Sequence, residues 1–372
     1  MGLKINTPKG TRDIYGTSCA KKIQIERDLM DIFLSYGYKR VETPTIEQGQ
    51  LFDKKYTSIP QNEVFRLFNN AGDVVALRAD ELNSVARYVS RFDNKNVVDR
   101  FSYLLNILRD KDKGLNEYTK AGSFVTGEDK PDIDAELIAL AVKALKYSGL
   151  DNFKISIGFA GFSDNTDIRT LTGDEKILTK ACELTKDRKT VDAVKRLADI
   201  YRILGYYNVT EYVNFDFGIE NKNNSYTGVI FIGHLEGRKQ VLLKGGRFDN
   251  LVEKFGKADK AAGFSININR LLNVMEKEKK SINIKHEHVV IYTNNRRKDA
   301  IIIGEYFRYK DLNIELIKHD GCTSKKDYIT KAYKKGALSV MFFDREKTVV
   351  ADLVNSKITN IELTEEKEEK EA

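Results

Sequence analysis

Residues 36–44 read Tyr-Gly-Tyr-Lys-Arg-Val-Glu-Thr-Pro, and this stretch decides the fold class. Before it, over residues 18–36, apolar side chains recur at helical spacing, and Gly37 is well placed to end that helix. After the glycine, residues 39–43 predict a strand. Pro44 closes the strand, because it has no N–H to donate to a central ladder. The sequence therefore predicts a helix followed by a strand that lies at the edge of a sheet or ends there.

Short apolar runs predict further strands downstream. The last two runs are spaced like a hairpin, so we expect an antiparallel sheet with helices added to it. From about residue 164 to 205 the chain is polar with helical periodicity, at 174–185 and 190–204, which predicts an inserted helical segment. The predicted strands are residues 64–68, 74–78, 100–109, 154–158, 228–234 and 240–244.

A charged segment at residues 277–285 separates a second unit from the first. Strands and helices alternate beyond it, which predicts a small parallel α/β domain over residues 286–360, after a first domain over residues 1–278. Residues 361–372 are rich in Glu and Lys, so we expect a disordered tail. The alternating elements are expected at residues 288–292, 296–309, 314–318, 324–335 and 338–343.

Composition narrows the class of protein. The chain has 372 residues, of which 41% are hydrophobic and 31% charged, so it is long enough to bury a large core. Cys19, Cys182 and Cys322 are far apart and form neither a disulfide framework nor a zinc spacing. No apolar run has the length of a signal peptide or a membrane span. We therefore expect a cytoplasmic protein without a structural metal.

The net charge of +7 and the pI near 8.9 raise the question of nucleic-acid binding. Binding to phosphates requires clustered Lys and Arg, whereas here lysines alternate with acids, as in Lys277-Glu278-Lys279. This pattern is typical of solvated helix faces and does not favour a nucleic-acid partner.

Seven short motifs follow one another between residues 7 and 271. In this order they resemble class II histidyl-tRNA synthetases, including motifs 1, 2 and 3 of that family. The resemblance implies an α+β fold, in which an antiparallel sheet with flanking helices precedes a small α/β domain similar to an anticodon-binding domain. The motifs are Thr7 to Asp13 with Tyr36 to Glu47, Leu77-Arg78-Ala79-Asp80, Asn106-Ile107-Leu108-Arg109, Gly127 with Pro131 and Asp134-Ala135-Glu136, Tyr226-Thr227-Gly228, Lys244 to Leu251, and Gly263-Phe264 through Arg270-Leu271.

The same resemblance places a vestigial ligand pocket. Arg109 and Arg270 could clamp a phosphate, because guanidinium groups suit phosphate oxygens, although Arg270 could equally be an ion-pair partner of Asp80 or Asp249. Gly245-Gly246 fits either a tight turn or a close approach of the backbone to a ligand. The candidate pocket residues are Asp80, Arg109, Lys120, Tyr226, Thr227 and Arg270.

Departures from the synthetase pattern bear on the chemistry. The motif 2 loop, residues 110–116, is short and carries Asp110 and Asp112 where a nucleotide would need cations. Lys120 and Phe124 stand where the family has a glutamine and a glutamate that recognise histidine. Each lost charge-assisted hydrogen bond to an amino acid is worth about 1.5–3 kcal/mol. Leu82 and Asn221 likewise replace a threonine and an arginine of the family, so the resemblance implies no aminoacylation, no catalytic residue and no cofactor.

A synthetase fold without its chemistry resembles the regulatory subunits of ATP phosphoribosyltransferase, the first enzyme of histidine biosynthesis. That resemblance implies a hetero-oligomer with a catalytic subunit, a homodimeric core built on residues 18–44, and histidine as an effector. Two alternatives stay open at this point. One is a pseudo-synthetase module that binds tRNA through basic residues of the C-terminal domain, namely Arg296, Arg297, Lys298, Lys325 and Lys326. The other is a divergent histidyl-tRNA synthetase or amino-acid ligase.

Overall fold

The computed structural model describes residues 5–91, 97–221, 225–238, 240–256, 259–280, 282, 284–344, 348–355 and 357–361. These residues fall into two compact units, one made of Met1–Asp13 with Lys22–Ile282, the other of Ile14–Lys21 with Asn283–Ala372. The part predicted to be a disordered tail lies outside the described residues from residue 362 onward. The three cysteines are free thiols.

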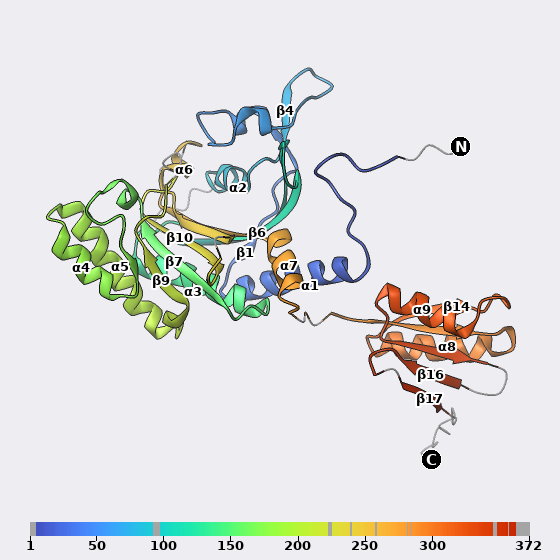
Figure 1. Cartoon of the computed structure of the whole chain (residues 1–372). Helices are drawn as coiled ribbons and strands as arrows, with labels where there is room; N and C mark the ends of the chain where they lie inside the picture. Colours follow the sequence, from blue (N-terminus) through green and yellow to red (C-terminus); the bar gives the residue numbers. More distant parts are fainter. Residues whose placement is uncertain are drawn as a thin grey trace, which may run out of the picture. The chain divides into compact units, whose positions relative to one another are not determined.

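A twisted sheet organises the larger unit (Figure 1). Among the described residues it has nine strands, which pair antiparallel except for β1 with β5 and β7 with β9. The predicted hairpin is confirmed as β10 and β11. In spatial order the strands are β1 (Lys39–Arg40), β5 (Asp99–Leu108), β6 (Glu117–Thr126), β12 (Ala261–Asn267), β11 (Val241–Arg247), β10 (Val229–Leu235), β7 (Phe153–Phe159), β9 (Val213–Asp216) and β8 (Thr172–Gly173).

The helix and strand predicted around residues 36–44 lie at the edge of this sheet. Helix α1 (Gly16–Ser35) buries Ile25, Leu29 and Phe33 on one face, and β1 is the outermost strand, as Pro44 predicted. The ladder is shorter than the predicted strand of residues 39–43, because the carbonyl of Thr43 turns away and accepts a hydrogen bond of 2.5 Å from the guanidinium of Arg78.

Helices cover both faces of the sheet (Figure 1). Helices α1, α3, α5 and α7 pack into a large apolar core on one face, while α2 and α6 close a smaller core on the other. A separate small sheet of three described strands runs in the order β2, β4, β3. The remaining elements of this unit are α2 (Glu81–Val89), α3 (Pro131–Tyr147), α4 (Lys176–Leu184), α5 (Arg188–Tyr206), α6 (Asn250–Glu253), α7 (Ile268–Lys277), β2 (Ile46–Gln48), β3 (Arg66–Phe68) and β4 (Val74–Leu77).

Residues 164–205 contain α4 and α5, together with the two-residue strand β8, which the polar helical pattern did not predict. Pro131 stands at the start of α3, where its missing N–H leaves no hydrogen bond unmade. Helix α3 is buried on nearly every side, so its start was recognised only through the family motif.

In its described residues, the smaller unit is a sheet with two α-helices. Strand β13 pairs parallel with β14 and β15, as the alternation of elements predicted. The prediction of a purely parallel sheet is wrong, however, because β16 and β17 extend this sheet antiparallel from β15. The elements are β13 (Glu287–Tyr292), α8 (Arg297–Tyr309), β14 (Asn313–Lys318), α9 (Lys325–Lys335), β15 (Ser339–Phe343), β16 (Thr348–Asp352) and β17 (Lys357–Ile361).

Candidate functional site

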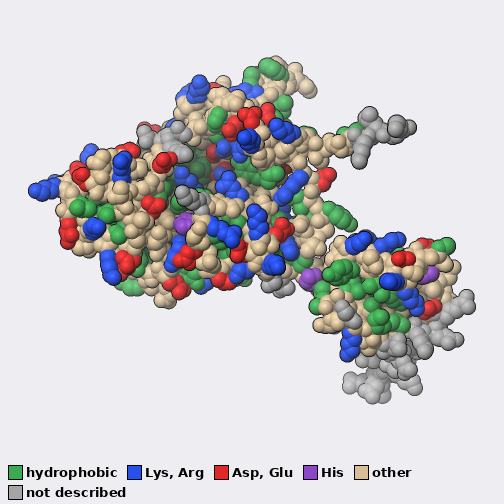
Figure 2. All heavy atoms as spheres, in the orientation of Figure 1, with side chains coloured by type: hydrophobic (Ala, Val, Ile, Leu, Met, Phe, Trp, Pro, Cys, Tyr) green, Lys and Arg blue, Asp and Glu red, His purple; other side chains and the backbone are tan. Residues whose placement is uncertain are grey.

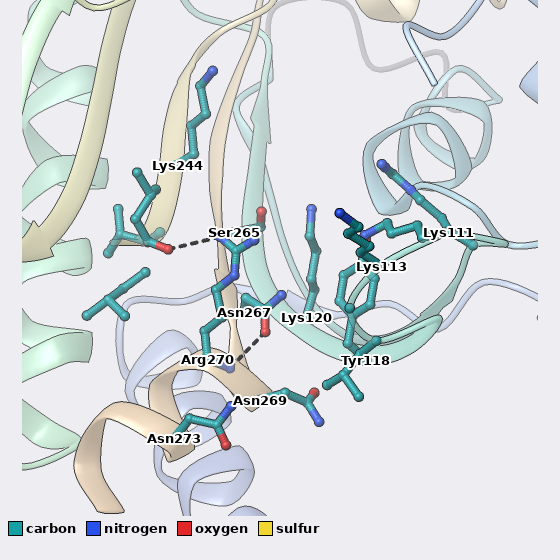
Figure 3. A pocket seen from close by; sticks show the side chains of 16 residues that line it. Lys111, Lys113, Tyr118, Lys120, Lys244, Ser265, Asn267, Asn269, Arg270 and Asn273 are labelled. Atoms are coloured by element: carbon teal, nitrogen blue, oxygen red, sulfur yellow. Dashed lines mark hydrogen bonds between the residues drawn. The ribbon is translucent and has the colours of Figure 1, made fainter. Parts of the chain in front are cut away.

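Two clefts of the larger unit open on the face of the sheet that carries α2. The first, which we call the basic cleft, has a volume of about 500 Å³ and lies between the β5–β6 connection, β11, β12 and the first turn of α7 (Figure 3). Lys and Arg side chains gather around a hollow on this side of the unit (Figure 2). The charged side chains that line the basic cleft are Arg109, Lys111, Lys113, Lys120, Lys244 and Arg270.

Strand register explains why residues far apart in sequence meet here. Lys120 of β6 stands opposite Asn267 of β12, and Lys244 of β11 stands opposite Ser265 of β12. Side chains of paired residues in a sheet project to the same face. The alternation along β6 therefore turns Lys120 toward the cleft, while the intervening residues face the core beneath.

Arg109 is held by the end of the strand before α2. Its Nε donates to the carbonyl of Ala79 at 2.8 Å, and its guanidinium nitrogens lie 3.5 Å from Asp80 and 3.8 Å from Glu63. Asp80 is also the N-cap of α2, since its carboxylate accepts from the N–H of Leu82 at 2.7 Å. Burial and the neighbouring Glu81 raise the pKa of Asp80.

Lys120 forms an ion pair within the protein. Its Nζ lies 2.6 Å from Oε1 of Glu81, whose side chain is only 2% exposed. Burial opposes the charged form of Glu81, yet Lys120 outweighs it and keeps the pKa of Glu81 below its ordinary value. Burial likewise opposes the charge on Lys120, but Glu81 and Asp80 raise its pKa. The charge of Lys120 is therefore matched by an acid of the same chain.

Arg270 makes neither of the ion pairs that the sequence left open. Its guanidinium donates to the carbonyl of Val241 at 3.1 Å, and its N–H donates to Oδ1 of Asn267, the N-cap of α7. The buried Arg247 takes the structural role instead, with Asp134 at 3.0 Å and Asp249 at 3.3 Å. Arg270 is thus directed toward the basic cleft.

The second cleft, the Asp80 cleft, has a volume of about 550 Å³ and shares Lys244 with the first. Asp80, Leu82 and Tyr226 line it. Burial, with the charges of Glu81 and Asp80, raises the pKa of Tyr226, and the ammonium of Lys244 lies 5.1 Å from the centre of its ring. It contains Asp80 and Tyr226 of the predicted ligand pocket.

The six residues predicted for one pocket are divided by the structure. Arg109, Lys120 and Arg270 line the basic cleft, Asp80 and Tyr226 line the Asp80 cleft, and Thr227 lines neither. Thr227 instead donates from Oγ1 to Asp249 at 3.0 Å, which fixes the strand ends behind the pocket.

Two of the departures from the family pattern have structural roles. Phe124 is fully buried and packs against Phe248 with ring centroids 5.2 Å apart, so it fills core space. Asn221 bonds to both the N–H and the carbonyl of Tyr226, at 3.0 and 2.8 Å, and closes a turn. Neither side chain takes the part of the acid or the arginine that it replaces.

Gly245-Gly246 do not form the tight turn that one sequence interpretation expected, and close approach of the backbone to a ligand stays a prediction. They lie inside β11, where a Cβ on Gly246 would come within 2.3 Å of the carbonyl of Val229 and 2.8 Å of the ring of Tyr226. The glycines therefore allow neighbouring strands and an aromatic ring to pack closely.

The expectation that the β5–β6 loop brings acids to the pocket is wrong. Lys111 and Lys113 line the basic cleft, whereas Asp110 and Asp112 do not. The N–H of Asp110 bonds to the carbonyl of Glu63, which helps to orient the loop. Sequence reasoning missed Lys111 and Lys113 because alternating charges were read as solvated surface, and it missed Glu81 because that residue stands beside a family motif.

The basic residues of the C-terminal unit are partly neutralised. Arg296 pairs with Asp299 at 2.7 Å, and Lys325 pairs with Asp344 at 3.0 Å. The described residues contain no group of His, Cys, Asp and Glu suited to a metal ion. No helix in the described part of the chain has the length and apolar character needed to cross a bilayer.

Comparison with known families places the chain. The family model for histidyl-tRNA synthetase matches residues 10–166 and 163–271. An ATP phosphoribosyltransferase regulatory subunit from Ruminiclostridium cellulolyticum is 33% identical over 95% of this chain and 96% of its own length. One from Acetivibrio thermocellus is 28% identical over 97% and 98%.

Solved structures agree on the fold. A Bacillus halodurans protein described as an ATP phosphoribosyltransferase regulatory subunit/histidyl-tRNA synthetase aligns with a TM-score of 0.79 at 24% identity, covering 92% of this chain and 99% of that one. The histidyl-tRNA synthetase of a Nostoc species aligns with a TM-score of 0.80 at 17% identity, covering 96% and 97%. These likenesses confirm the predicted fold class.

Proposed function

Since the chain belongs to the ATP phosphoribosyltransferase regulatory subunits, within the wider histidyl-tRNA synthetase family, we propose that it is the non-catalytic subunit of that enzyme. In this role it supports the activity and the feedback control of the first step of histidine biosynthesis. The relatives with that name align with this chain over nearly their whole length, so the assignment covers both units of the chain.

The observation that carries the non-catalytic part of the proposal is the ion pair of Lys120 with Glu81. A synthetase presents its pocket side chains to the amino acid, whereas here the cation at this position is satisfied at 2.6 Å by a buried carboxylate. An amino-acid substrate would have to compete with that contact. Phe124, packed in the core, removes a second recognition group.

Formation of a complex with the catalytic subunit tests the proposal. The full-length chain is mixed with a short-form catalytic subunit from the same organism and analysed by size-exclusion chromatography with light scattering. We expect one complex that contains both chains. Separate elution of the two proteins at concentrations of about 10 µM would contradict the regulatory role.

A homodimeric core is part of the proposal. Ile23 and Leu34 of α1 are 50% and 67% exposed. They stand eleven residues apart, close to three turns, and so share a face of the helix opposite the buried Ile25 and Leu29. A second copy of this chain would cover these two apolar side chains, because closed pairs of like surfaces are the commonest oligomers.

We further propose that histidine acts as the effector at the Asp80 cleft, which Asp80 and Tyr226 line, next to Lys120 of the adjoining basic cleft. The cleft offers a carboxylate for an ammonium group, and no cofactor, membrane or nucleic acid is required for this role. A cytoplasmic location follows from the proposed partner. Charge exchange in the variant Lys120→Glu with Glu81→Lys keeps the ion pair but reverses its direction. Histidine inhibition of the complex should weaken in that variant while activation is retained, and unchanged inhibition would place the sensor elsewhere.

A further inference from the structure

Residues 8–11 form a tight turn ahead of α1, which we call the N-terminal turn. The N–H and the Oγ1 of Thr11 both donate to the carbonyl of Pro8, at 3.1 and 2.7 Å. Gly10 has a φ of 79°, a left-handed value that favours glycine at this position of a turn. The turn therefore has a defined shape of its own, although Pro8 and Lys9 are exposed.

The N-terminal turn is bound by Asn116, the last residue of the β5–β6 loop. The backbone N–H of Asn116 donates to the carbonyl of Gly10 at 2.7 Å, and its Nδ2 donates to the carbonyl of Lys9 at 3.3 Å. Asn116 is buried, and a Cβ on Gly10 would lie 2.7 Å from its Cγ. The contact is therefore too close for any residue larger than glycine at position 10.

The other two polar atoms of Asn116 close the β5–β6 loop. Its carbonyl accepts from the N–H of Arg109 at 2.8 Å, and its Oδ1 accepts from the N–H of Lys111 at 3.0 Å. Asn116 thus makes two hydrogen bonds to the turn and two to the loop. An unpaired buried donor is costly, so without the turn Asn116 would move toward water and give up its hold on the loop.

The position of this loop decides the charge of the basic cleft. Lys111 and Lys113 line the cleft, whereas Asp110 and Asp112, which alternate with them, do not. The ammonium of Lys111 also lies 4.6 Å from the centre of the Tyr118 ring. A shift of the loop that turned these side chains away would remove two cations from the cleft.

We propose that the N-terminal turn is a clasp that holds Lys111 and Lys113 in the basic cleft, and that its release lets both lysines leave the cleft. The clasp lies at the surface, where Pro8 and Lys9 are exposed, so it can open while the core stays packed. The fold thus contains a switch for the charge of the cleft, and the N-terminal segment sets that switch.

Hydrogen–deuterium exchange of the full chain tests the clasp, with the variants Gly10→Ala and Asn116→Asp. Gly10→Ala places a methyl group where Asn116 packs. Asn116→Asp keeps the acceptor for the N–H of Lys111 but replaces the donor to Lys9 with a second oxygen. We expect the amide of Lys111 to exchange roughly tenfold faster in both variants, as the loss of hydrogen bonds to the turn implies. Exchange in the buried helix α3 should stay unchanged.

The matched control is Gly72→Ala. Gly72 likewise has a left-handed φ, of 87°, but a Cβ there would have no non-neighbouring described atom within 4 Å. This variant should leave the exchange of the Lys111 amide unchanged. Equal acceleration in the control, no acceleration in Gly10→Ala and Asn116→Asp, or equal acceleration throughout α3 would each overturn the proposal, because the turn would then not act on the loop in particular.

Limited digestion with trypsin tests whether a lysine leaves the cleft. Trypsin must bind the lysine side chain after which it cuts, so cleavage after Lys111 requires that its ammonium leave the cleft. Proteolysis of an opened form follows its population, so this cleavage should be roughly tenfold faster in Gly10→Ala than in the original protein or in Gly72→Ala. An equal rate in all three would show that Lys111 stays in place and would overturn the proposal. Both measurements use the isolated chain, so their outcome is independent of assembly with a catalytic subunit.

Discussion

Removing the ammonium of Lys120 should destabilise the larger unit measurably. In the variant Lys120→Met, the Glu81 carboxylate keeps its burial but loses the partner at 2.6 Å. Its second oxygen already has no hydrogen-bond partner among the described residues. The nearby Asp80 loses a stabilising charge as well.

The size of this destabilisation follows from the exposure of the Lys120 and Glu81 side chains. Breaking a fully buried ion pair costs about 3–5 kcal/mol, whereas an exposed pair is worth about 0–1 kcal/mol. The Glu81 side chain is 2% exposed and that of Lys120 is 21% exposed. We therefore expect Lys120→Met to lower the free energy of unfolding by about 2–3 kcal/mol. The double variant Lys120→Met with Glu81→Gln should recover to within about 1 kcal/mol of the original protein.

Urea unfolding followed by circular dichroism at 222 nm is the assay, since the chain contains no Trp. The exposed pair of Lys325 with Asp344 supplies the control, and Lys325→Met should change stability by less than about 1 kcal/mol. A cost below about 0.5 kcal/mol for Lys120→Met, or a double variant as unstable as the sum of the single ones, would refute this account of the pair.

The stabilisation by the Lys120–Glu81 pair depends on pH with a defined sign. The folded pKa of Glu81 is lowered, so its stabilisation is present above the unfolded value of about 4.3 and is lost as pH falls through the folded pKa. The folded pKa of Lys120 is raised, so its contribution is complete below the unfolded value of about 10.4 and is lost as pH rises through the folded pKa. The cost of Lys120→Met should therefore be largest between about pH 5 and 10 and should shrink in acid.

Three further outcomes are expected. The purified chain should catalyse no histidine-dependent pyrophosphate exchange with ATP, because Lys120 and Glu81 form an ion pair with each other. Exchange above the background of a buffer control would show a working synthetase site. Sedimentation at micromolar concentration should show a dimer, and Leu34→Lys should weaken its association at least tenfold. Tyr206→Lys, at a 75% exposed residue of α5, should leave the association unchanged. A strict monomer contradicts the proposed homodimeric core. Limited trypsin digestion should cut first within residues 277–285 and release two stable fragments, and first cuts inside α3 would contradict the proposed domain division.

Much of the fold could be predicted because its signals are local. The edge strand was read from Pro44, and the β10–β11 hairpin from two adjacent apolar runs. Strand β6 was missed because Lys120 and Gly122 interrupt its apolar pattern. Gly122 is required there, since a Cβ would lie 2.4 Å from the hydroxyl of Tyr103.

The site was less predictable because it depends on contacts between distant residues. Glu81 and Lys120 are joined only when α2 packs on the sheet, and neither residue type indicates the other. Lys111 and Lys113 alternate with Asp110 and Asp112, and only the path of the β5–β6 loop decides which pair lines the cleft. Family motifs located the region, but side-chain direction decided its chemistry.

The central claim is that this chain acts through a partner rather than by its own catalysis, and a titration of activity tests it most directly. A short-form catalytic subunit is held at fixed concentration, and the rate of ATP phosphoribosyltransferase is measured as this chain is added. Activation requires only that the chain bind the active conformation better than the inactive one. The account predicts a rate that rises and saturates at a fixed ratio of the two chains. A rate that stays at the level of the catalytic subunit alone, at every ratio, would contradict it.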